Sequence, residues 1–307
     1  MVQKSETIWF DGKQVPWDEA NVHVLTHALH YATAVFEGIR AYECADGSSE
    51  VFRLKDHMVR FVDSAKILGI KMPYTADEMT EAAIETLKRN KLAGAYVRPL
   101  AFVGEGAMGV YPGDNPTRVI VACWPWGAYL GEDALEKGIN VRCSSFSRHH
   151  INVMMVKAKA SGNYVNSVLA KNEAIADGYD EAILLDTTGH VSEGTGENIF
   201  LVRDDIIYTP HLDGVLGGLT RDSIISLAND LGYEVREEPI ARDMLYVADE
   251  VFFTGTAAEL TPISTVDRRT IGTGTAGPVA KLLQTEFFKI VKGENPDYEH
   301  WLHRYQA

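Results

Sequence analysis

Cysteine is scarce in this chain, with three cysteines among 307 residues and no CxxC pair. Cys44, Cys123 and Cys143 lie far apart and are odd in number. This argues against a disulfide framework and against a cysteine-based zinc site. Free thiols are typical of a reducing compartment, so we expect a cytoplasmic protein.

Long hydrophobic runs are also missing. No stretch approaches the ~18 consecutive apolar residues that a membrane span needs. The opening residues, Met1 to Thr7, lack the apolar core of a signal peptide. We therefore expect no membrane segment and no membrane partner.

Basic residues are in deficit, since 29 Lys and Arg face 43 Asp and Glu, for a formal net charge of −14. Such a chain repels phosphate backbones, which argues against a nucleic-acid partner. Small anionic substrates stay possible, because a few local arginines can outweigh a distant net charge. Repeats and low-complexity segments are absent as well, and 46% apolar residues predict a globular protein of about two domains at this length.

The first half of the chain predicts a mixed α+β domain. Asp11-Gly12 favours a tight type I′ turn, and Thr75 with Glu78 forms a capping-box pattern at a helix start. The predicted elements are a hairpin of Thr7–Phe10 and Lys13–Val15, strands at Val51–Leu54, Ala95–Val103 and Thr117–Trp124, and helices over 55–68 and 75–87.

The segment from Trp124 to Gly131 interrupts this pattern with Pro and Gly and predicts a linker. We expect domains at 1–124 and 132–307, joined by a linker over 125–131. In the second half we expect strands near Ile139–Ser144, Glu181–Asp186, Asn198–Val202, Ile206–Tyr208, Glu234–Glu237 and Asp249–Thr254, and helices at Asn163–Asp177, Thr220–Leu231 and Pro278–Val291.

Two apparent motifs favour ordinary structure over chemistry. Residues 272–277 match the letters G-x-G-x-x-G, but only 30 residues follow, too few for the rest of a dinucleotide-binding unit. Pro278 more simply opens the last helix. His23, His27 and His30 could share a helix face, yet no acid completes a ligand set, so we expect core or interface histidines and no metal.

Two glycine-containing turns in the second half are typical of anion binding. Gly217-Gly218 precedes a helix that starts near Thr220, and the first N–H groups of a helix lack internal partners. An ordinary loop capped by Thr220 is an equally good interpretation on its own. Thr254 to Glu259 is a similar turn at a strand end. Together they suggest an anionic ligand held mostly by backbone.

Lysines and carboxylates complete a possible constellation. Lys157 and Lys159 stand close to Val153, Met154, Met155, Val156 and Ala160, an apolar setting that would lower a lysine pKa and make the amine nucleophilic. A solvated lysine is the more common alternative. Tyr164 follows at a helix start. Glu193 and Glu197 lie in a Gly-rich turn between strands, where a buried Glu would need a cationic partner.

An amine, a phenol, a carboxylate and a phosphate cradle are what pyridoxal 5′-phosphate requires. Over nearly its whole length the chain resembles the branched-chain amino-acid aminotransferases, which are class IV, or fold type IV, pyridoxal-phosphate enzymes. The segments that carry this resemblance are His27-Ala-Leu-His-Tyr31, Phe36-Glu-Gly-Ile-Arg40, Tyr96-Val-Arg-Pro99, Lys159-Ala-Ser-Gly-Asn-Tyr164, Ser192-Glu-Gly-Thr-Gly-Glu-Asn198, Gly218-Leu-Thr-Arg221 and Gly255-Thr-Ala-Ala-Glu259.

The resemblance implies a small N-terminal α/β domain and a larger, β-barrel-like C-terminal domain with flanking helices. It implies transamination of leucine, isoleucine and valine with 2-oxoglutarate, in an enzyme that is at least a homodimer. Lys159 is implied to bond the cofactor and shuttle the substrate proton. Glu193 is implied to face the pyridine nitrogen, Tyr164 the phenolic oxygen, and the phosphate to be held by Arg60, Leu219, Thr220 and Thr256. Leu216 is implied to contact the cofactor as well.

On the substrate side, the Thr256 and Ala257 amides with Tyr96 resemble a site for the α-carboxylate. Arg98 resembles a residue at the far end of the side-chain pocket. The other residues that match the branched-chain pattern around this pocket are Tyr31, Phe36, Gly38, Arg40, Met108, Val110 and Tyr129. In the family, Tyr31 and Val110 reach a neighbouring subunit.

Some alternatives share this fold: D-amino-acid and (R)-amine transaminases, and aminodeoxychorismate lyase. The pocket residues argue against them, and the presence of Lys159, Glu193, Tyr164 and Arg60 argues against a catalytically inactive binding protein. Ser161 stands where a Gly is frequent, and Gly217-Gly218 replaces a more familiar Pro-Gly or Arg-Gly pair. Neither departure removes a side chain that does chemistry.

Overall fold

The computed structural model describes residues 2–126 and 133–307, and the chain divides into two compact units. Unit 1 consists of Met1–Trp126, Ala158–Gly162 and Lys289–Ala307, and unit 2 of Gly127–Lys157 and Asn163–Phe288. This division differs from contiguous domains at 1–124 and 132–307, because two later segments group with the first unit. Most of the predicted linker, 125–131, lies outside the described residues.

Unit 1 is built on one eight-stranded sheet with the order β17-β5-β4-β6-β7-β1-β2, in which β3 also pairs with β6. Its strands are β1 (Thr7–Phe10), β2 (Lys13–Pro16), β3 (Ala34–Phe36), β4 (Ile39–Glu43), β5 (Ser49–Phe52), β6 (Ala95–Val103), β7 (Thr117–Trp124) and β17 (Leu302–Tyr305). Its helical segments are η1 (Trp17–Glu19), α1 (His27–Tyr31), α2 (Leu54–Ile67), α3 (Ala76–Arg89) and η4 (Pro296–Trp301).

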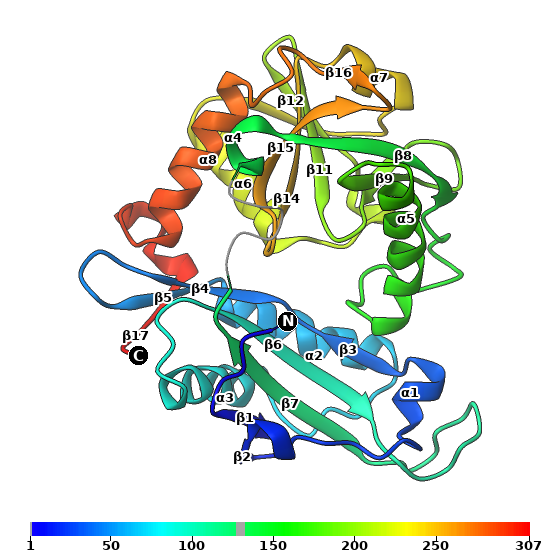
Figure 1. Ribbon diagram of the computed structural model, residues 1–307, viewed down its shortest axis with the longest axis vertical. Helices are drawn as coiled ribbons and strands as arrows, with labels where there is room; N and C mark the ends of the chain where they lie inside the picture. The colour runs from blue at the N-terminus through cyan, green and yellow to red at the C-terminus, as the bar shows by residue number, and fades with distance from the viewer. Residues whose placement is uncertain (1, 127–132) are drawn as a thin grey trace. The chain divides into compact units, whose positions relative to one another are not determined.

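Helices α2 and α3 cover one face of this sheet (Figure 1). Their apolar stripes explain why: Met58 and Phe61 of α2 and Met79 of α3 are completely buried. They pack in one core with sheet residues such as Val97 and Val121. Helix α2 also carries His57 and Arg60, which matter for the site.

Local sequence signals in unit 1 are confirmed. Asp11 and Gly12 both have positive φ, as a type I′ turn requires, and β1 pairs with β2 from Thr7↔Pro16 to Phe10↔Lys13. Thr75 accepts from the Glu78 N–H while the Glu78 carboxylate accepts from the Thr75 N–H, so the capping box is formed. The short strands β3 and β4 and the distant strand β17 were not predicted.

Unit 2 is built on a nine-stranded sheet with the order β10-β9-β8-β15-β14-β11-β12-β13, in which β16 also pairs with β15. Its strands are β8 (Ile139–Ser147), β9 (Glu181–Leu185), β10 (Val191–Gly194), β11 (Asn198–Arg203), β12 (Ile206–Thr209), β13 (Glu234–Glu237), β14 (Glu250–Gly255), β15 (Glu259–Val266) and β16 (Arg269–Thr270). Other elements are α4 (Ala134–Lys137), η2 (Ser161–Asn163, mostly in unit 1), α5 (Tyr164–Ala176), η3 (Leu212–Gly214), α6 (Leu219–Asp230), α7 (Arg242–Val247) and α8 (Pro278–Val291).

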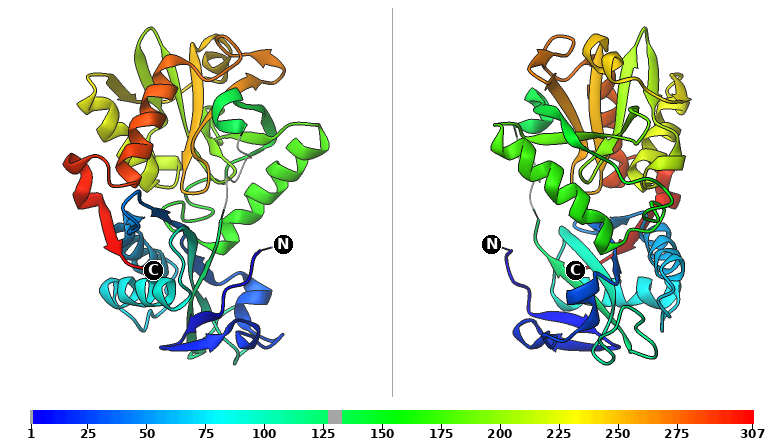
Figure 2. Two further views of the ribbon diagram at one scale, coloured as in Figure 1. Left: turned by 60° about the vertical axis from the view of Figure 1, so that its left-hand side comes forward. Right: turned by 90° about the vertical axis from the view of Figure 1, so that its right-hand side faces the viewer.

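The second sheet must curl. Strand β10 is at one end of the strand order and β11 is sixth, yet only residues 195–197 join them along the chain. A sheet can satisfy both conditions only by bending round, as in part of a barrel. Helix α5 packs along β8 and β9 (Figure 2). The predicted mixed α+β class is confirmed.

One expectation for unit 2, the turn over residues 191–198, needs correction, and another, the helix start at Pro278, is confirmed. Residues 191–198 are not a turn throughout, because Val191–Gly194 forms β10 and pairs with β9 across a register shift between Val191 and Glu193. Pro278 does begin α8. The Glu250 carboxylate accepts from the Val279 and Ala280 N–H groups, so this glycine-rich segment ends at a helix start already occupied by a carboxylate.

The described residues include no helix that is both long enough and apolar enough to cross a membrane.

Candidate active site

In unit 1, the backbone of Lys159 is fixed on both sides. Its N–H donates to Ser64 Oγ of α2 at 3.0 Å, and its carbonyl accepts from the Phe36 N–H at 3.0 Å. The next residue, Ala160, forms an isolated bridge with Val35. Lys159 Nζ lies 5.3 Å from the centroid of the Phe36 ring. A half-buried amine is therefore positioned at the end of β3.

Lys157, the other candidate amine, has different surroundings. Its Nζ donates to the Leu212 carbonyl, and burial lowers its pKa. The apolar setting expected from the sequence is only partly present, because Val153 is 70% exposed and Met155 is 50% exposed. A loop carbonyl thus engages Lys157, which argues for Lys159 as the reactive lysine.

Arg60 is held by a buried carboxylate that the sequence analysis did not assign. Glu37 is completely buried and accepts from Arg60 Nε at 2.7 Å and Nη2 at 2.8 Å, and from His57 Nδ1 at 2.7 Å. Burial opposes ionisation of Glu37, but Arg60 and His57 outweigh it and hold its pKa well below the usual value. Burial lowers the pKa of His57, whose Nδ1 lies 2.7 Å from the Glu37 carboxylate.

Arg98 lies among aromatic rings in unit 1. Its guanidinium carbon is 4.8 Å from the Phe36 ring centroid, 5.3 Å from that of Tyr96 and 6.0 Å from that of Trp124. Nη2 donates to the Tyr96 hydroxyl at 3.2 Å, while the buried Nε has no hydrogen-bond acceptor within the described residues. Glu105, an acid that follows β6 in the chain, lies near His23, at 3.6 Å.

Gly38 is required where it stands. A Cβ atom at this position would overlap the Tyr96 hydroxyl, so a larger residue would displace Tyr96 and its hydrogen bond to Arg98. Arg40 is directly opposite Tyr96 in the β4–β6 register. Gly38, Arg40, Tyr96, Arg98 and Phe36 are thus brought together at the end of β3, the start of β4 and the facing part of β6.

Other predicted pocket residues are placed differently. The Tyr31 hydroxyl donates to the Met108 carbonyl at 2.7 Å, so these two residues are together. Val110 is 81% exposed, so the described part of the chain does not bury it. Tyr129 lies outside the described residues.

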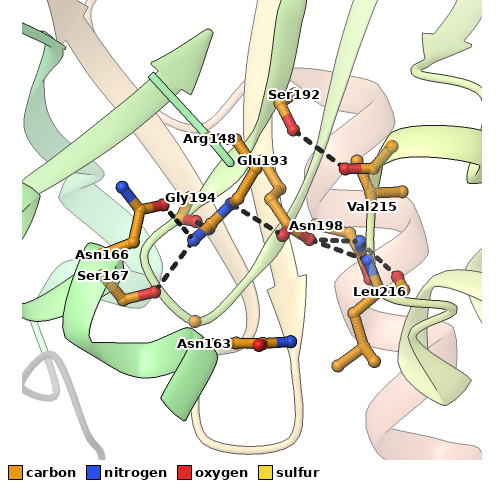
Figure 3. Close-up of polar contacts among 12 residues, drawn as sticks. Arg148, Asn163, Asn166, Ser167, Ser192, Glu193, Gly194, Asn198, Val215 and Leu216 are labelled. Atoms are coloured by element: carbon orange, nitrogen blue, oxygen red, sulfur yellow. Dashed lines mark hydrogen bonds and ion pairs between the residues drawn. The ribbon is translucent and has the colours of Figure 1, made fainter. Parts of the chain in front are cut away.

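In unit 2, Glu193 has the cationic partner that its burial requires. Arg148 Nε lies 3.1 Å from Glu193 Oε1, with the arginine side chain 5% exposed and the glutamate 13% exposed (Figure 3). The Leu216 N–H also donates to Glu193 Oε2 at 3.2 Å. A guanidinium and a backbone N–H thus face the Glu193 carboxylate. Arg148 was not identified from the sequence.

Asn198 links Glu193 to the turn before α6. Its Nδ2 donates to the Leu216 carbonyl at 3.0 Å and lies 3.5 Å from Glu193 Oε2 (Figure 3). A Cβ atom at Gly218 would overlap Asn198 Oδ1, so glycine permits this close approach. The carboxylate and the turn are therefore parts of one packed arrangement.

The two predicted anion-binding turns lie in unit 2 as expected. Gly218 precedes α6 without a side-chain cap, and within the described chain no protein group accepts from the Leu219 or Thr220 N–H. The second turn connects β14 to β15 and contains Thr256 and Ala257. Thr254 Oγ1, at its start, is buried and has no partner among the described residues. These donors suit an anionic ligand.

Two further buried carboxyl groups, those of Glu197 and Glu181, lie near Glu193. Glu197 is 6% exposed and close to Glu181, which accepts from Lys171 Nζ at 2.7 Å and from Thr195 Oγ1 at 2.8 Å. Burial, together with the Glu181 charge, raises the pKa of Glu197 to about 8. Glu197 Oε2 accepts from the Gly196 N–H at 2.9 Å. A protonated carboxyl thus supports the β10–β11 turn at neutral pH.

Of His23, His27 and His30, His27 is a core residue, whereas the other two are exposed. The His27 side chain is completely buried, with Nδ1 2.9 Å from Thr33 Oγ1 and Nε2 2.8 Å from the Gly109 carbonyl. His23 lies outside α1, so the three histidines do not share a helix face. No group of three or more potential metal ligands occurs in the part of the chain that the structure describes.

Sequence reasoning missed Glu37, His57 and Arg148. Glu37 belongs to the Phe36-Glu-Gly-Ile-Arg40 segment, and its position before a glycine in an apolar stretch was an available signal. No signal in the sequence pointed to Arg148, because its partners are residues 166, 167, 193 and 194, which are distant in the chain.

Comparison with known proteins defines the class. The family described as "Amino-transferase class IV" matches residues 34–266, well over half of the chain. The chain therefore belongs to the class IV aminotransferase family, which confirms the resemblance.

The individual relatives are more specific. The chain is 48% identical over 301 residues to "Branched-chain-amino-acid aminotransferase" of Pseudomonas aeruginosa, with 98% of each covered. Two solved structures of branched-chain amino acid aminotransferases are also similar. The Escherichia coli structure is 49% identical with a TM-score of 0.95 and covers 97% of this chain and 99% of that one. The Thermobaculum terrenum structure, described as the PLP-form, is 37% identical with a TM-score of 0.92 and covers 98% of both chains.

The raised pKa of Glu197 predicts a pH-dependent stability. Between the ordinary value of 4.5 and the raised value, the folded state holds a proton that the unfolded state has lost, so stability falls as pH rises through this range. Glu197→Gln removes that loss. We expect the wild type to lose about 1 kcal/mol or more of its free energy of unfolding relative to the variant between pH 5.5 and pH 8.5. Urea unfolding at the two pH values measures this difference. The exposed Glu136→Gln serves as control, and a parallel pH dependence in Glu197→Gln and wild type would contradict the assignment.

Proposed function

We propose that the protein transfers amino groups between branched-chain L-amino acids (leucine, isoleucine and valine) and 2-oxoglutarate, with pyridoxal 5′-phosphate as cofactor. The observation that carries the proposal is Glu193, a carboxylate held beside Arg148 in a chain of the class IV family. The branched-chain specificity is supported by relatives that carry this name over their full length.

The residues present fit this cofactor. It combines an aldehyde, a phenolic oxygen, a basic ring nitrogen and a phosphate, and when bound it supplies a ring that withdraws electrons from the substrate α-carbon. The chain offers an amine, a phenol and a carboxylate. The Leu219, Thr220 and Thr254 donors, which have no acceptor among the described residues, can take an anion.

Each residue near the reacting atoms has a proposed task. Lys159 would hold the cofactor through its ε-amine, and once the substrate amine has displaced it, that free amine would accept the substrate α-proton and later give it back. Glu193 keeps the ring nitrogen protonated through its negative charge. Tyr164 donates a hydrogen bond to the phenolic oxygen. Arg60, with Leu219, Thr220 and Thr256, holds the phosphate.

The substrate is proposed to bind through two groups of residues. The Thr256 and Ala257 N–H groups and the Tyr96 hydroxyl take the α-carboxylate. Branched side chains are buried against the aromatic residues of the pocket at about 25 cal/mol per Å². The pocket residues are Tyr31, Phe36, Gly38, Arg40, Met108, Val110 and Tyr129.

We also propose a homodimer, at least, in the cytoplasm. Val110 and Tyr111 are 81% and 82% exposed, and Tyr31 is 41% exposed, an apolar surface that association would bury. The free Cys44, Cys123 and Cys143 agree with a reducing compartment.

The proposed activity is tested by initial rates with a panel of amino donors and 2-oxoglutarate. We expect leucine, isoleucine and valine to exceed D-amino acids and (R)-amines by at least about tenfold in kcat/KM, because the pocket residues match the branched-chain pattern. Purified protein should also be yellow. A preference for a D-amino acid or an (R)-amine would overturn the specificity, and a colourless protein that takes up no pyridoxal phosphate would overturn the function.

Lys159→Ala should abolish turnover, because it removes the amine proposed to bond the cofactor and move the proton. Lys157→Ala is the matched control and should keep most of the activity, since Lys157 contacts the Leu212 carbonyl. Borohydride reduction of the wild type followed by peptide mapping should place the pyridoxyl group on residue 159. Labelling of Lys157 would show that the assignment of the two lysines is wrong.

Arg98 is proposed to recognise the distal carboxylate of glutamate, together with the Tyr31 hydroxyl, and to rest among Phe36, Tyr96 and Trp124 when an apolar substrate is bound. Arg98→Leu should slow the glutamate half-reaction at least about thirtyfold more than the leucine half-reaction, because an unpaired buried carboxylate costs about 2–5 kcal/mol. Arg118→Leu, which removes an arginine stacked on Phe10 at 4.7 Å, is the control.

Stopped-flow measurement of the two half-reactions separates these possibilities. Equal losses in both would mean that Arg98 supports the sheet and that glutamate is recognised elsewhere.

A further inference from the structure

Arg148 follows directly after β8 and contacts two other elements of unit 2. Its Nη1 donates to Asn166 Oδ1 at 3.0 Å and to Ser167 Oγ at 3.1 Å, both on the first turn of α5. Its Nη2 donates to the Gly194 carbonyl at 2.7 Å, at the end of β10 (Figure 3). Nε lies 3.1 Å from Glu193 Oε1. One guanidinium therefore joins the start of α5 to the end of β10.

These two places carry two proposed cofactor contacts. Tyr164 is the first residue of α5, two positions before Asn166, and Glu193 is the third residue of β10. The phenolic oxygen and the nitrogen that these residues meet belong to one rigid ring, so the spacing between Tyr164 and Glu193 must match it. A planar guanidinium with five fixed N–H donors is suited to set such a spacing.

Two features argue against a purely incidental contact. Arg148 is 5% exposed, and a buried arginine is retained at a cost unless its donors are satisfied. The Nε contact with Glu193 is an ion pair without good hydrogen-bond geometry, since this atom has no hydrogen-bond partner among the described residues. Arg148 thus acts on Glu193 mainly through charge and on Gly194 through a directed hydrogen bond.

We propose that Arg148 is a positioning residue for the transamination, which aligns the Glu193 carboxylate with the ring nitrogen and sets its distance from Tyr164. This inference rests on the proposed function. Arg148 touches neither the reacting atoms nor the substrate, so it acts through Glu193. The competing interpretation is that Arg148 only ties α5 to β10.

A double-mutant cycle separates the two interpretations. The variants are Arg148→Met, Glu193→Gln and the double variant, and the rate of the leucine half-reaction is followed in each as the absorbance of the bound cofactor changes. Arg142→Met is the matched control, because Arg142 of β8 also pairs with α5, through Glu173 at 3.6 Å, and with Asp177 just beyond it, away from Glu193. Cofactor dissociation constants and the thermal midpoints of the apoproteins are measured alongside.

We expect Glu193→Gln to slow the half-reaction by about 10²–10³ and Arg148→Met by at least about tenfold in the wild-type background. In the Glu193→Gln background, Arg148→Met should change the rate by less than about twofold, because the group that it positions is already neutral. Arg148→Lys keeps the charge without the fork and should restore part of the rate. Arg142→Met should leave the rate unchanged.

An equal loss from Arg148→Met in both backgrounds would overturn the proposal, as would a rate within about threefold of wild type. If Arg148→Met does not fold, the same cycle with Arg148→Lys decides. The proposed function fails in a different way: wild-type protein would then take up no cofactor, or its bound cofactor would not react with leucine.

Discussion

An ionised carboxylate is buried at tolerable cost only when cations or N–H donors surround it, and this constraint shapes the important parts of each unit. In unit 1, Glu37 is paired with Arg60, and this pair joins α2 to the β3–β4 connection. In unit 2, Glu193 is paired with Arg148, and Glu181 with Lys171. Glu197, beside Glu181, meets the same constraint differently, by keeping its proton.

The paired groups also explain why several glycines cluster near them. Carboxylates and amides can satisfy each other only where the backbone comes close, and a Cβ atom at Gly38 or Gly218 would occupy the space of Tyr96 or Asn198. Gly38 and Gly218 are therefore places of dense packing. The same density keeps the turn before α6 and the Glu193 carboxylate in a fixed arrangement within unit 2.

Features set by neighbouring residues were predictable from the sequence. The Asp11-Gly12 turn, the Thr75–Glu78 capping box and the start of α8 at Pro278 depend on a few adjacent positions. The roles proposed for Lys159, Tyr164 and Glu193 rest on motif resemblance. The contacts of Arg60 with Glu37 and of Arg148 with Gly194 were not predictable, because the partners are 23 and 46 positions apart in the sequence. Strand β10 was missed because a register shift and a glycine interrupt its alternation.

Strand β17 has a consequence for synthesis on the ribosome. It pairs with β5 from Leu302↔Phe52 to Tyr305↔Ser49, and the buried Tyr305 hydroxyl donates to the Ala93 carbonyl at 3.2 Å (Figure 1). The sheet that begins with the first ten residues is therefore completed only after about 300 residues have been translated. Until then the edge of β5 that β17 covers lacks its partner in the nascent chain, and an unpaired strand edge is a place where wrong pairing can occur.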